Sequence, residues 1–252
     1  MDQQSTTSTI EPAEQAPEQQ VKKRKKVRAA HIIALILAVA GVGTLLYPTW
    51  LTHRLVAAMD VEVTNWQERT AEHGSSELDG LIAAMHEHNL QLAQSAQSGL
   101  KDPFSYEQPG FDLSAYGIAE DVVGRLKVSR LGLDAPIVLG GSADNLARGI
   151  ALLGQTSLPV GGENTNVVLA GHRAPGMLWD VEDLQIGDTI EVSNVRDTLV
   201  YRIIETKVIV PSAIEEVLIQ PEKDLITILT CHPLRKNYQR YLVRAERVLE
   251  QE

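Results

Sequence analysis

The sequence has 252 residues, of which 44% are hydrophobic and 22% charged, a balance typical of a globular protein with a buried core. Its formal net charge of -10 argues against a nucleic-acid-binding protein, because such proteins usually present a basic face. The charge is uneven: residues 1–28 carry six Lys or Arg against four Asp or Glu, so the rest of the chain carries about -12.

Residues 1–28 predict a disordered cytoplasmic tail that ends in basic residues. The first twenty positions are rich in Gln, Glu, Ser and Thr and have almost no large apolar side chain. The basic cluster KKRKKVR follows, from Lys22 to Arg28. Because Lys and Arg flanking a membrane span stay on the cytoplasmic side, this cluster predicts a cytoplasmic N-terminus.

Residues 29–47, AAHIIALILAVAGVGTLLY, predict a transmembrane helix. A helix of this length spans roughly 28 Å, close to the hydrocarbon thickness of a bilayer. Tyr47 and Trp50 stand where an interfacial aromatic belt would lie. We therefore expect a single-pass protein of the cell membrane whose later residues are extracellular. A cleaved signal peptide is the alternative, although the tail and the apolar run are long for one, and it also exports the remainder.

Residues 48–100 predict an extracellular helical region. Several apolar residues fall near one helical face: Leu78, Leu81, Ile82, Met85 and Leu92. The stretch HGSS, from His73 to Ser76, is expected to divide the region into two helices. His86 and His88 diverge on a helix and are not expected to share a metal ion.

Residues 101–117 predict an irregular connector, because KDPFSYEQPGFDLSAY holds two prolines, a glycine and four aromatic residues. From residue 118 to 252, short apolar runs broken by Gly and Pro predict a mainly β domain, either a barrel or a sandwich. Short helices are expected at Leu146–Leu153 and Ala213–Leu218.

Cys231 is the only cysteine in the sequence. An exported lone thiol can be a buried small hydrophobe, an intermolecular crosslink or a nucleophile. It closes the apolar run ITILTC, in which Thr227, Leu229 and Cys231 face one way and Ile226, Ile228 and Thr230 the other. Pro233 is expected to end this strand, which would place the thiol at a strand terminus.

Two further residues, His172 and Arg240, are candidates for chemistry beside the thiol. His232 is a poor partner, because neighbours on a strand face opposite sides. His172 ends another apolar run, in VVLAGHRAPG, and is the better acid or base, although a surface histidine is the plainer interpretation of it. Arg240 follows Cys231 by nine residues, which suits a hairpin that brings the guanidinium beside the thiol. Arg240 and Arg244 are expected to face away from the core.

Cysteine, histidine and arginine together make a coherent acyl-transfer site. The thiolate would attack a peptide carbonyl, and cationic neighbours favour the thiolate. Arg240 would stabilise the oxyanion, and His172 would protonate the departing amine.

In its ordered set of motifs, the chain resembles the sortases, cysteine transpeptidases of Gram-positive cell surfaces. The motifs are TILTC with an arginine nine residues later, AGHR upstream and an N-terminal anchor. Two stretches resemble the pilin-polymerising class C most closely, GQTSLPVGGENTNVVLAGHR and KDLITILTC. The resemblance covers roughly residues 118–250 and the anchor.

The resemblance implies an eight-stranded β-barrel with His172, Cys231 and Arg240 as catalytic residues and Thr230 as support for the groove and oxyanion site. The implied substrate is a surface or pilin protein with an LPXTG-like sorting signal, cut through a thioacyl-enzyme and passed to an amine. We assign no cofactor and no metal, since no convincing acidic cluster offers a site for the calcium known in the wider family.

Class C members often carry a lid with an Asp-Pro-aromatic motif, and Asp102, Pro103 and Phe104 match it. An Asp-Pro pair can also simply start a turn. The stretch CHPLRKNYQR departs from the class C pattern after the nucleophile, and the chain has no second hydrophobic segment near its C-terminus.

The favoured function is therefore pilus assembly, with a pilin lysine as the amine. The alternative within the family is a housekeeping-type enzyme that attaches surface proteins to a cell-wall precursor. Outside that activity stand an inactive, lid-closed binding module and a hydrolytic cysteine peptidase.

Overall fold

The computed structural model describes residues 18–97, 100, 111–118 and 121–249, with side chains described from residue 30 onward. The predicted lid residues Asp102, Pro103 and Phe104 lie outside the described residues, as do residues 1–17 of the predicted tail. The chain divides into two compact units, Met1–Trp50 and Leu51–Glu252.

Helix α1 (Glu18–Glu72) is 55 residues long and contains Pro48, which cannot donate an intrahelical hydrogen bond. Within the described residues, the part from Ala30 onward is the one helix long and apolar enough to cross a membrane. Its apolar side chains are exposed over the predicted span, as Leu35 and Leu37 illustrate at 65% and 66%. That exposure is what a lipid-facing helix requires.

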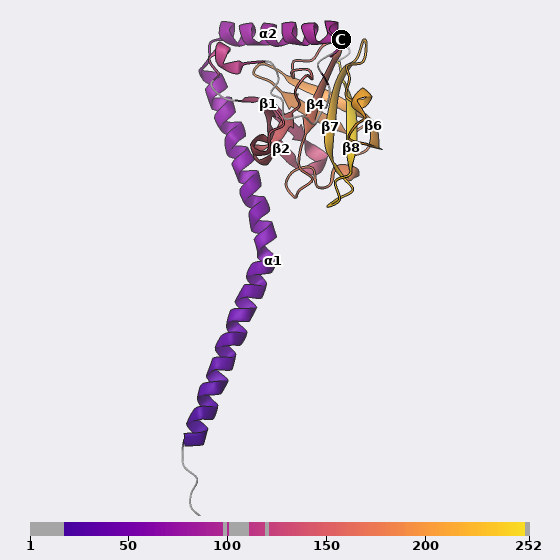
Figure 1. Ribbon diagram of the computed structural model, residues 1–252. Coiled ribbons are helices and arrows are strands. Elements are labelled where there is room, and N and C mark those ends of the chain that lie inside the picture. Colours follow the sequence, from indigo (N-terminus) through magenta and orange to yellow (C-terminus); the bar gives the residue numbers. More distant parts are fainter. Residues whose placement is uncertain (1–17, 98–99, 101–110, 119–120, 250–252) are drawn as a thin grey trace, which may run out of the picture. The chain divides into compact units, whose positions relative to one another are not determined.

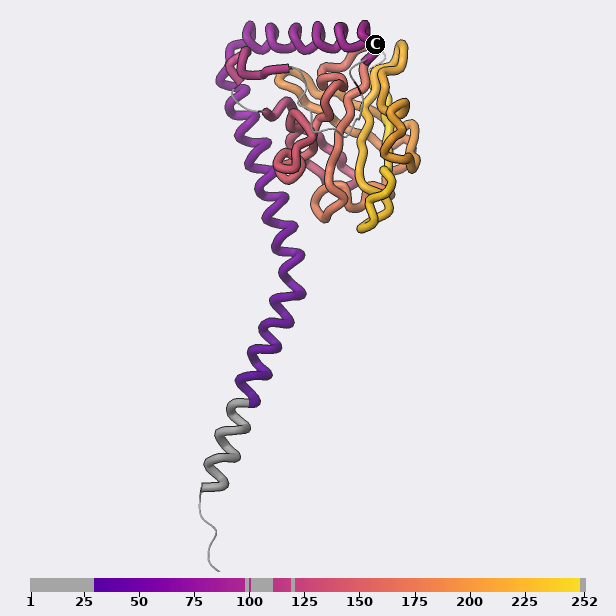
Figure 2. The backbone as a smooth tube through the Cα atoms, viewed as in Figure 1, coloured from indigo at the N-terminus to yellow at the C-terminus, as the bar shows by residue number. Residues whose placement is uncertain are grey.

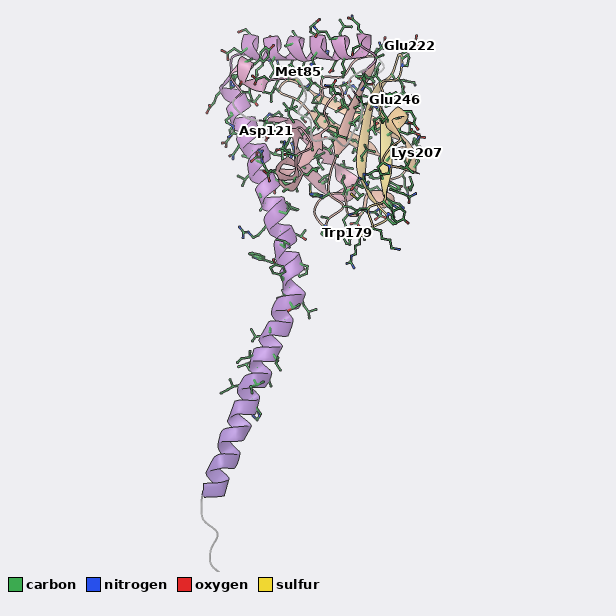
Figure 3. All side chains as sticks on the ribbon, in the orientation of Figure 1. Met85, Asp121, Trp179, Lys207, Glu222 and Glu246 are labelled. Atoms are coloured by element: carbon green, nitrogen blue, oxygen red, sulfur yellow. The ribbon has the colours of Figure 1, made fainter. Side chains whose placement is uncertain are left out.

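Helix α2 (Ser75–Gln94) follows after a short break, which confirms the predicted division at HGSS. Its apolar face is buried as expected, and Met85 is 1% exposed on the side turned toward the barrel (Figure 3). In the second unit, α1 buries Met59, Val63 and Trp66.

The second unit contains a closed barrel of eight strands, which confirms the predicted fold class (Figure 1). The strands are β1 (Val122–Val128), β2 (Leu133–Leu139), β3 (Ile150–Leu152), β4 (Thr165–Ala170), β5 (Thr189–Ser193), β6 (Thr198–Ile209), β7 (Asp224–His232) and β8 (Gln239–Arg247). Their order around the barrel is β1-β2-β3-β4-β7-β8-β6-β5, and β2–β3 and β4–β7 pair in parallel. Figure 2 shows β7 and β8, in yellow, beside the earlier strand β4.

The helix expected at Leu146–Leu153 is wrong in its second half. Helix α3 (Ala143–Arg148) ends at Gly149, and the next residues form β3 beside β2. A Cβ on Gly149 would lie 2.6 Å from the carbonyl oxygen of Pro136, so the close approach of these strands requires glycine there. At Ala213–Leu218 the structure has a single 3₁₀ turn, η4 (Ile214–Glu216).

Three further 3₁₀ turns are η1 (Leu113–Tyr116), η2 (Ser129–Leu131) and η3 (Val181–Asp183). The main apolar core includes Ile226 and Ile228 of β7, whereas Leu229 belongs to a second apolar cluster. This division confirms the alternation predicted for ITILTC. The second cluster joins Leu229 to Leu242 of β8 and to Val217 in the segment between β6 and β7.

Asn89 fixes α2 to the barrel domain. Its side-chain amide donates to the carbonyl oxygen of Leu158 at 3.0 Å, and its carbonyl oxygen accepts from the Leu158 amide at 2.8 Å. The residue is 3% exposed, so neither bond can be replaced by water without local opening.

We expect Asn89→Ala to destabilise the protein by roughly 2 kcal/mol, because it leaves both backbone groups of Leu158 buried without partners. For a unit of this size the unfolding temperature should fall by about 4–8 °C. Thermal unfolding followed by circular dichroism measures the change, with Leu90→Ala, on the exposed face of α2, as the matched control. Equal unfolding temperatures for the two variants would contradict this role of Asn89.

Candidate active site

Strands β7 and β8 place Cys231 directly opposite Arg240. The two strands pair antiparallel over eight residue pairs, of which Cys231–Arg240 is the last but one. The predicted hairpin is therefore confirmed, and β7 ends at His232, immediately before Pro233. Cys231 is partly exposed, as a thiol that meets an external substrate must be.

Strand β4 carries His172 to the same end of the barrel. It pairs in parallel with β7, so the carboxyl ends of both strands lie side by side. Gly171 precedes the histidine, and a Cβ there would lie 2.6 Å from Ile150 and 2.8 Å from Leu178. The backbone carbonyl of His172 then accepts bonds from the amides of Ala174 and Leu178, which fixes the loop that begins at the histidine.

The three predicted residues line one groove with a volume of about 200 Å³. The full lining is Gly141, Leu146, Leu153, Ala170, Gly171, His172, Leu229, Thr230, Cys231 and Arg240. Its floor is apolar because Leu153, Ala170 and Leu229 belong to the second apolar cluster. The structure thus brings His172 and Arg240 together around the only cysteine of the sequence.

Thr230 is buried and bonds across the strand ends. Its hydroxyl donates to the carbonyl oxygen of Gly171 at 2.8 Å. Because a hydroxyl has one proton to give, this bond withholds that proton from an oxyanion. Thr230 therefore supports the wall of the groove through the backbone next to His172.

The guanidinium of Arg240 is oriented by backbone carbonyls. Its Nη1 donates to the carbonyl oxygens of Asn237 and Gln239, both at 2.9 Å. These two bonds hold one nitrogen of the planar, charged group in place on the strand that pairs with Cys231.

His232 does not line the groove. Its Nδ1 lies 2.9 Å from Glu182 Oε1 and 3.2 Å from Arg173 Nη1. The prediction that it makes a poor partner for Cys231 agrees with this position, since its ring is engaged elsewhere.

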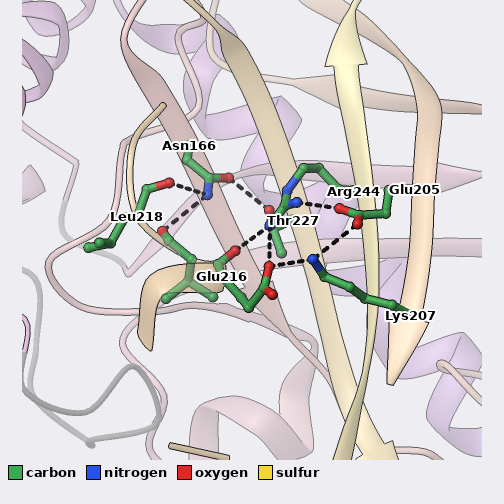
Figure 4. Close-up of polar contacts among 8 residues, drawn as sticks. Asn166, Glu205, Lys207, Glu216, Leu218, Thr227 and Arg244 are labelled. Carbon is green, nitrogen blue, oxygen red and sulfur yellow. Dashed lines mark hydrogen bonds and ion pairs between the residues drawn. The ribbon is translucent and has the colours of Figure 1, made fainter. Parts of the chain in front are cut away.

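Arg244 faces away from the main core, as predicted, and lies among polar side chains (Figure 4). It is nevertheless buried, at 6% exposure. Strand β8 is not an edge, because it lies between β7 and β6. The guanidinium forms ion pairs with Glu205 and Glu216, and Lys207 bridges the same two carboxylates. Arg244 is thus engaged in a structural cluster and does not line the groove with Arg240.

The same cluster anchors the segment 210–223, between β6 and β7. Asn166 on β4 donates to the carbonyl oxygens of Val217 and Leu218, at 3.0 and 3.2 Å. Thr227 on β7 donates to the Asn166 side-chain oxygen at 2.9 Å. These bonds hold the segment against β4 and β7 (Figure 4). Val217 of the segment packs in the second apolar cluster.

The charges in this cluster shift one another's proton affinities. Burial raises the pKa of Glu216, but hydrogen bonds from Lys207 and Arg244 outweigh it and leave that pKa below its ordinary value of 4.5. Burial lowers the pKa of Lys207, and its bonds to Glu216 and Glu205 raise it above the ordinary value.

The sequence did not predict two polar clusters near the site. One joins Arg244 to Glu205, Lys207 and Glu216, and the other joins Glu182 to Arg173 and His232. Glu205, Lys207 and Glu216 are spread over β6 and the following turn, and Glu182 lies in η3, so no local spacing links them to β8 or β7. Among the residues that the structure describes, no group of three or more His, Cys, Asp or Glu side chains could hold a metal ion.

Comparison with known proteins gives the family of the chain. The sortase domain family is matched by residues 126–248. Sortase C from Clostridium perfringens SM101 is similar in structure, with 32% identity, a TM-score of 0.64 and coverage of 75% of this chain and 99% of that one. A second structure of that enzyme, with the C-terminal cell wall sorting motif, gives 31% identity, a TM-score of 0.65 and coverage of 75% and 98%.

Sortase C1 of GBS pilus island 1 is 28% identical with a TM-score of 0.66, and the match covers 79% of this chain and 100% of that one. Among curated relatives, sortase D of Bacillus subtilis (strain 168) is 27% identical over 128 residues, which are 50% of this chain and 63% of that protein. The chain belongs to the sortase family of cysteine transpeptidases. The sortases from Clostridium perfringens and GBS pilus island 1 are class C enzymes. The chain spans less than two thirds of the length of sortase D.

We expect Glu216→Gln to destabilise the protein by roughly 1–2 kcal/mol near neutral pH, since hydrogen bonds to charged groups are worth about that much or more. A lowered folded pKa means that folding favours the ionised carboxylate, so the stabilisation is present above 4.5 and is lost as the pH falls below it. Urea unfolding at pH values from about 7 to 3 should show the gap between the two proteins closing toward acid.

Glu215→Gln is the matched control, because the neighbouring carboxylate is exposed. A gap that stays constant with pH would contradict the ionic role of Glu216.

Proposed function

We propose that this protein is a membrane-anchored sortase of class C type that joins surface proteins through new amide bonds. In this proposal, it cuts an LPXTG-like sorting signal through a thioacyl-enzyme and passes the acyl group to an amine, in pilus assembly a pilin lysine. The observation that carries the proposal is that His172, Cys231 and Arg240 line one groove.

In the first step the thiolate of Cys231 attacks the carbonyl carbon of the scissile peptide bond. A C–S bond forms, and the carbonyl π electrons move to oxygen to give a tetrahedral oxyanion. Arg240 then stabilises this charge with its directed N–H donors. Its bonds to Asn237 and Gln239 support this role, because donors fixed in advance need no reorganisation as charge develops.

In the second step the oxyanion collapses and the C–N bond breaks. The imidazolium of His172 gives its proton to the departing amine, which leaves a thioester on Cys231 and a neutral imidazole. The incoming amine attacks the thioester, His172 takes its proton back, and the thiolate departs as the new amide bond forms. One histidine thus serves both half-reactions without any net proton loss.

The apolar floor of the groove suits a sorting signal. Leu146, Leu153 and Leu229 line it beside the sulfur. An extended peptide with an aliphatic side chain upstream of the scissile bond would bury that side chain here while its carbonyl lies near Cys231. A strongly charged peptide would gain little from such a floor.

The apolar part of α1 supports the proposed anchor. Its length suffices to cross a bilayer, and the basic cluster Lys22–Arg28 precedes it, which favours a cytoplasmic N-terminus and an extracellular catalytic domain. Anchoring would confine the enzyme to the surface where its protein substrates emerge. The similarity to sortase C1 of GBS pilus island 1 favours pilus assembly over attachment to a cell-wall precursor.

We expect the purified full chain to form a covalent adduct with an LPXTG peptide, because the thiolate becomes acylated at Cys231. Intact-protein mass spectrometry would detect an adduct of the acyl fragment, and Cys231→Ala should abolish it. Failure of the wild-type protein to form an adduct would favour the inactive binding module.

With an excess of amine, the product should be the ligated peptide. A pilin domain with an accessible lysine and a short amine-bearing wall peptide, offered in competition, separate pilus assembly from wall attachment. Release of free carboxylate despite excess amine would instead indicate a hydrolytic peptidase.

Arg240→Lys should lower kcat about 10²–10³-fold, because lysine lacks the planar fork that holds both the backbone carbonyls and the oxyanion. Steady-state ligation of the sorting peptide measures this, with Arg235→Lys, exposed in the loop that precedes β8, as the control. Turnover close to that of the wild type would remove Arg240 from the mechanism.

A further inference from the structure

We propose that Arg173, Glu182 and His232 form a polar bridge that positions His172 and Cys231 for the reaction. None of the three lines the groove, so they act through their neighbours as positioning residues. The proposal rests on the proposed function, since it assigns these residues a role in the same site.

The strand ends that carry His172 and Cys231 need a connection of their own. The parallel register of β4 and β7 ends at the pair Ala170–Leu229, before either of the two residues is reached. Two bonds extend it: the Gly171 amide donates to the carbonyl of Leu229 at 3.2 Å, and the Thr230 hydroxyl donates to the carbonyl of Gly171 at 2.8 Å. The bridge joins Arg173 and His232, two residues further along both segments.

Glu182 is the centre of the bridge. Its Oε1 lies 2.8 Å from Arg173 Nη1 and 2.9 Å from His232 Nδ1. A carboxylate accepts but does not donate, so Nδ1 must carry a proton for this bond. The 3.2 Å approach of Arg173 Nη1 to the same ring nitrogen is then a contact between two donors that converge on one oxygen.

Because the Arg173 side chain is buried, its charge needs the ion pair with Glu182. The arginine side chain is 8% exposed, and Nε also donates to the carbonyl of Trp179 at 3.4 Å. A buried guanidinium needs an anionic partner, and Glu182 supplies it from η3. The hydrogen bond from Arg173 outweighs the opposing effect of burial and lowers the pKa of Glu182, so the carboxylate is ionised at neutral pH.

The bridge holds the two reacting residues because its members are their neighbours in the sequence. Arg173 follows His172, and His232 follows Cys231. Covalent and polar contacts thus connect His172 to Cys231 through Arg173, Glu182 and His232. The ring of His232 also lies against Tyr241 of β8, with centroids 5.9 Å apart, so the same side chain touches the strand that carries Arg240. Displacement of either strand end breaks the connection from His172 to Cys231.

The spacing between imidazole and thiol is therefore set outside the groove, where substrate cannot disturb it. His172 itself is exposed, and its ring gains this support through the residue that follows it. The arrangement predicts that loss of the bridge affects the chemical step more than peptide binding, because the apolar floor of the groove is left unchanged.

The test compares His232→Phe, which keeps a ring but loses the donor, with His232→Asn, whose amide nitrogen can donate from nearly the same position. Glu182→Ala removes the acceptor, and Asp183→Ala is the control in the same turn, since that carboxylate is exposed. Each is made in the full chain and measured for kcat and KM with an LPXTG peptide and an amine, for unfolding temperature, and for the pH profile of Cys231 alkylation by iodoacetamide.

We expect His232→Phe and Glu182→Ala to lower kcat roughly 10–100-fold, the effect of a small misplacement of reacting groups, with KM changed less than about twofold. Both should also shift the pH profile of alkylation, whereas His232→Asn and Asp183→Ala should stay near the wild type in both respects.

Unchanged kcat and an unchanged alkylation profile in His232→Phe and Glu182→Ala would overturn the proposal. So would a loss of kcat in His232→Asn equal to that in His232→Phe and proportional to the fall in unfolding temperature, because that pattern describes a purely structural role. If the wild-type protein turns over no sorting peptide, the proposed function fails, while the alkylation profiles still test the bridge.

Discussion

The parallel pairing of β4 with β7 is the constraint on which the site depends. Six residue pairs join the two strands, and β8 pairs with the other side of β7. The ends of these strands present His172, Cys231 and Arg240 to one groove. Because parallel strands run in the same direction, their carboxyl ends lie at the same edge of the sheet. Two segments far apart in the sequence therefore place their last side chains beside each other.

The outer surface of these three strands is organised by charge as well as by apolar packing. Leu229 and Leu242 belong to the apolar cluster under the groove, and Arg244, two residues beyond Leu242 on β8, belongs to a polar cluster with Glu205 and Glu216. Both clusters are covered by the segment 210–223. A chain with a strong negative charge thus uses a buried arginine to neutralise two carboxylates and to fix a segment beside the groove.

The parts of the site that depend on local spacing could be predicted from the sequence. A strand ending at Pro233 and a nine-residue interval sufficed for the Cys231–Arg240 pair. His172 could not be placed by spacing, since its pairing across β4 and β7 is long-range, and the family resemblance supplied it. Arg244 was expected only to face away from the core, and its burial depends on acidic partners from β6 and η4 that no local spacing links to it.

The barrel is closed, so each of the eight strands has a neighbour on both sides. A peptide therefore cannot be recruited by adding a strand to an open sheet edge, the mode that many peptide-binding domains use. Under the proposed function, discrimination among peptide substrates would come from how their side chains fit the groove beside Cys231. Such an enzyme would tolerate wide variation in whatever protein precedes its short recognition tag.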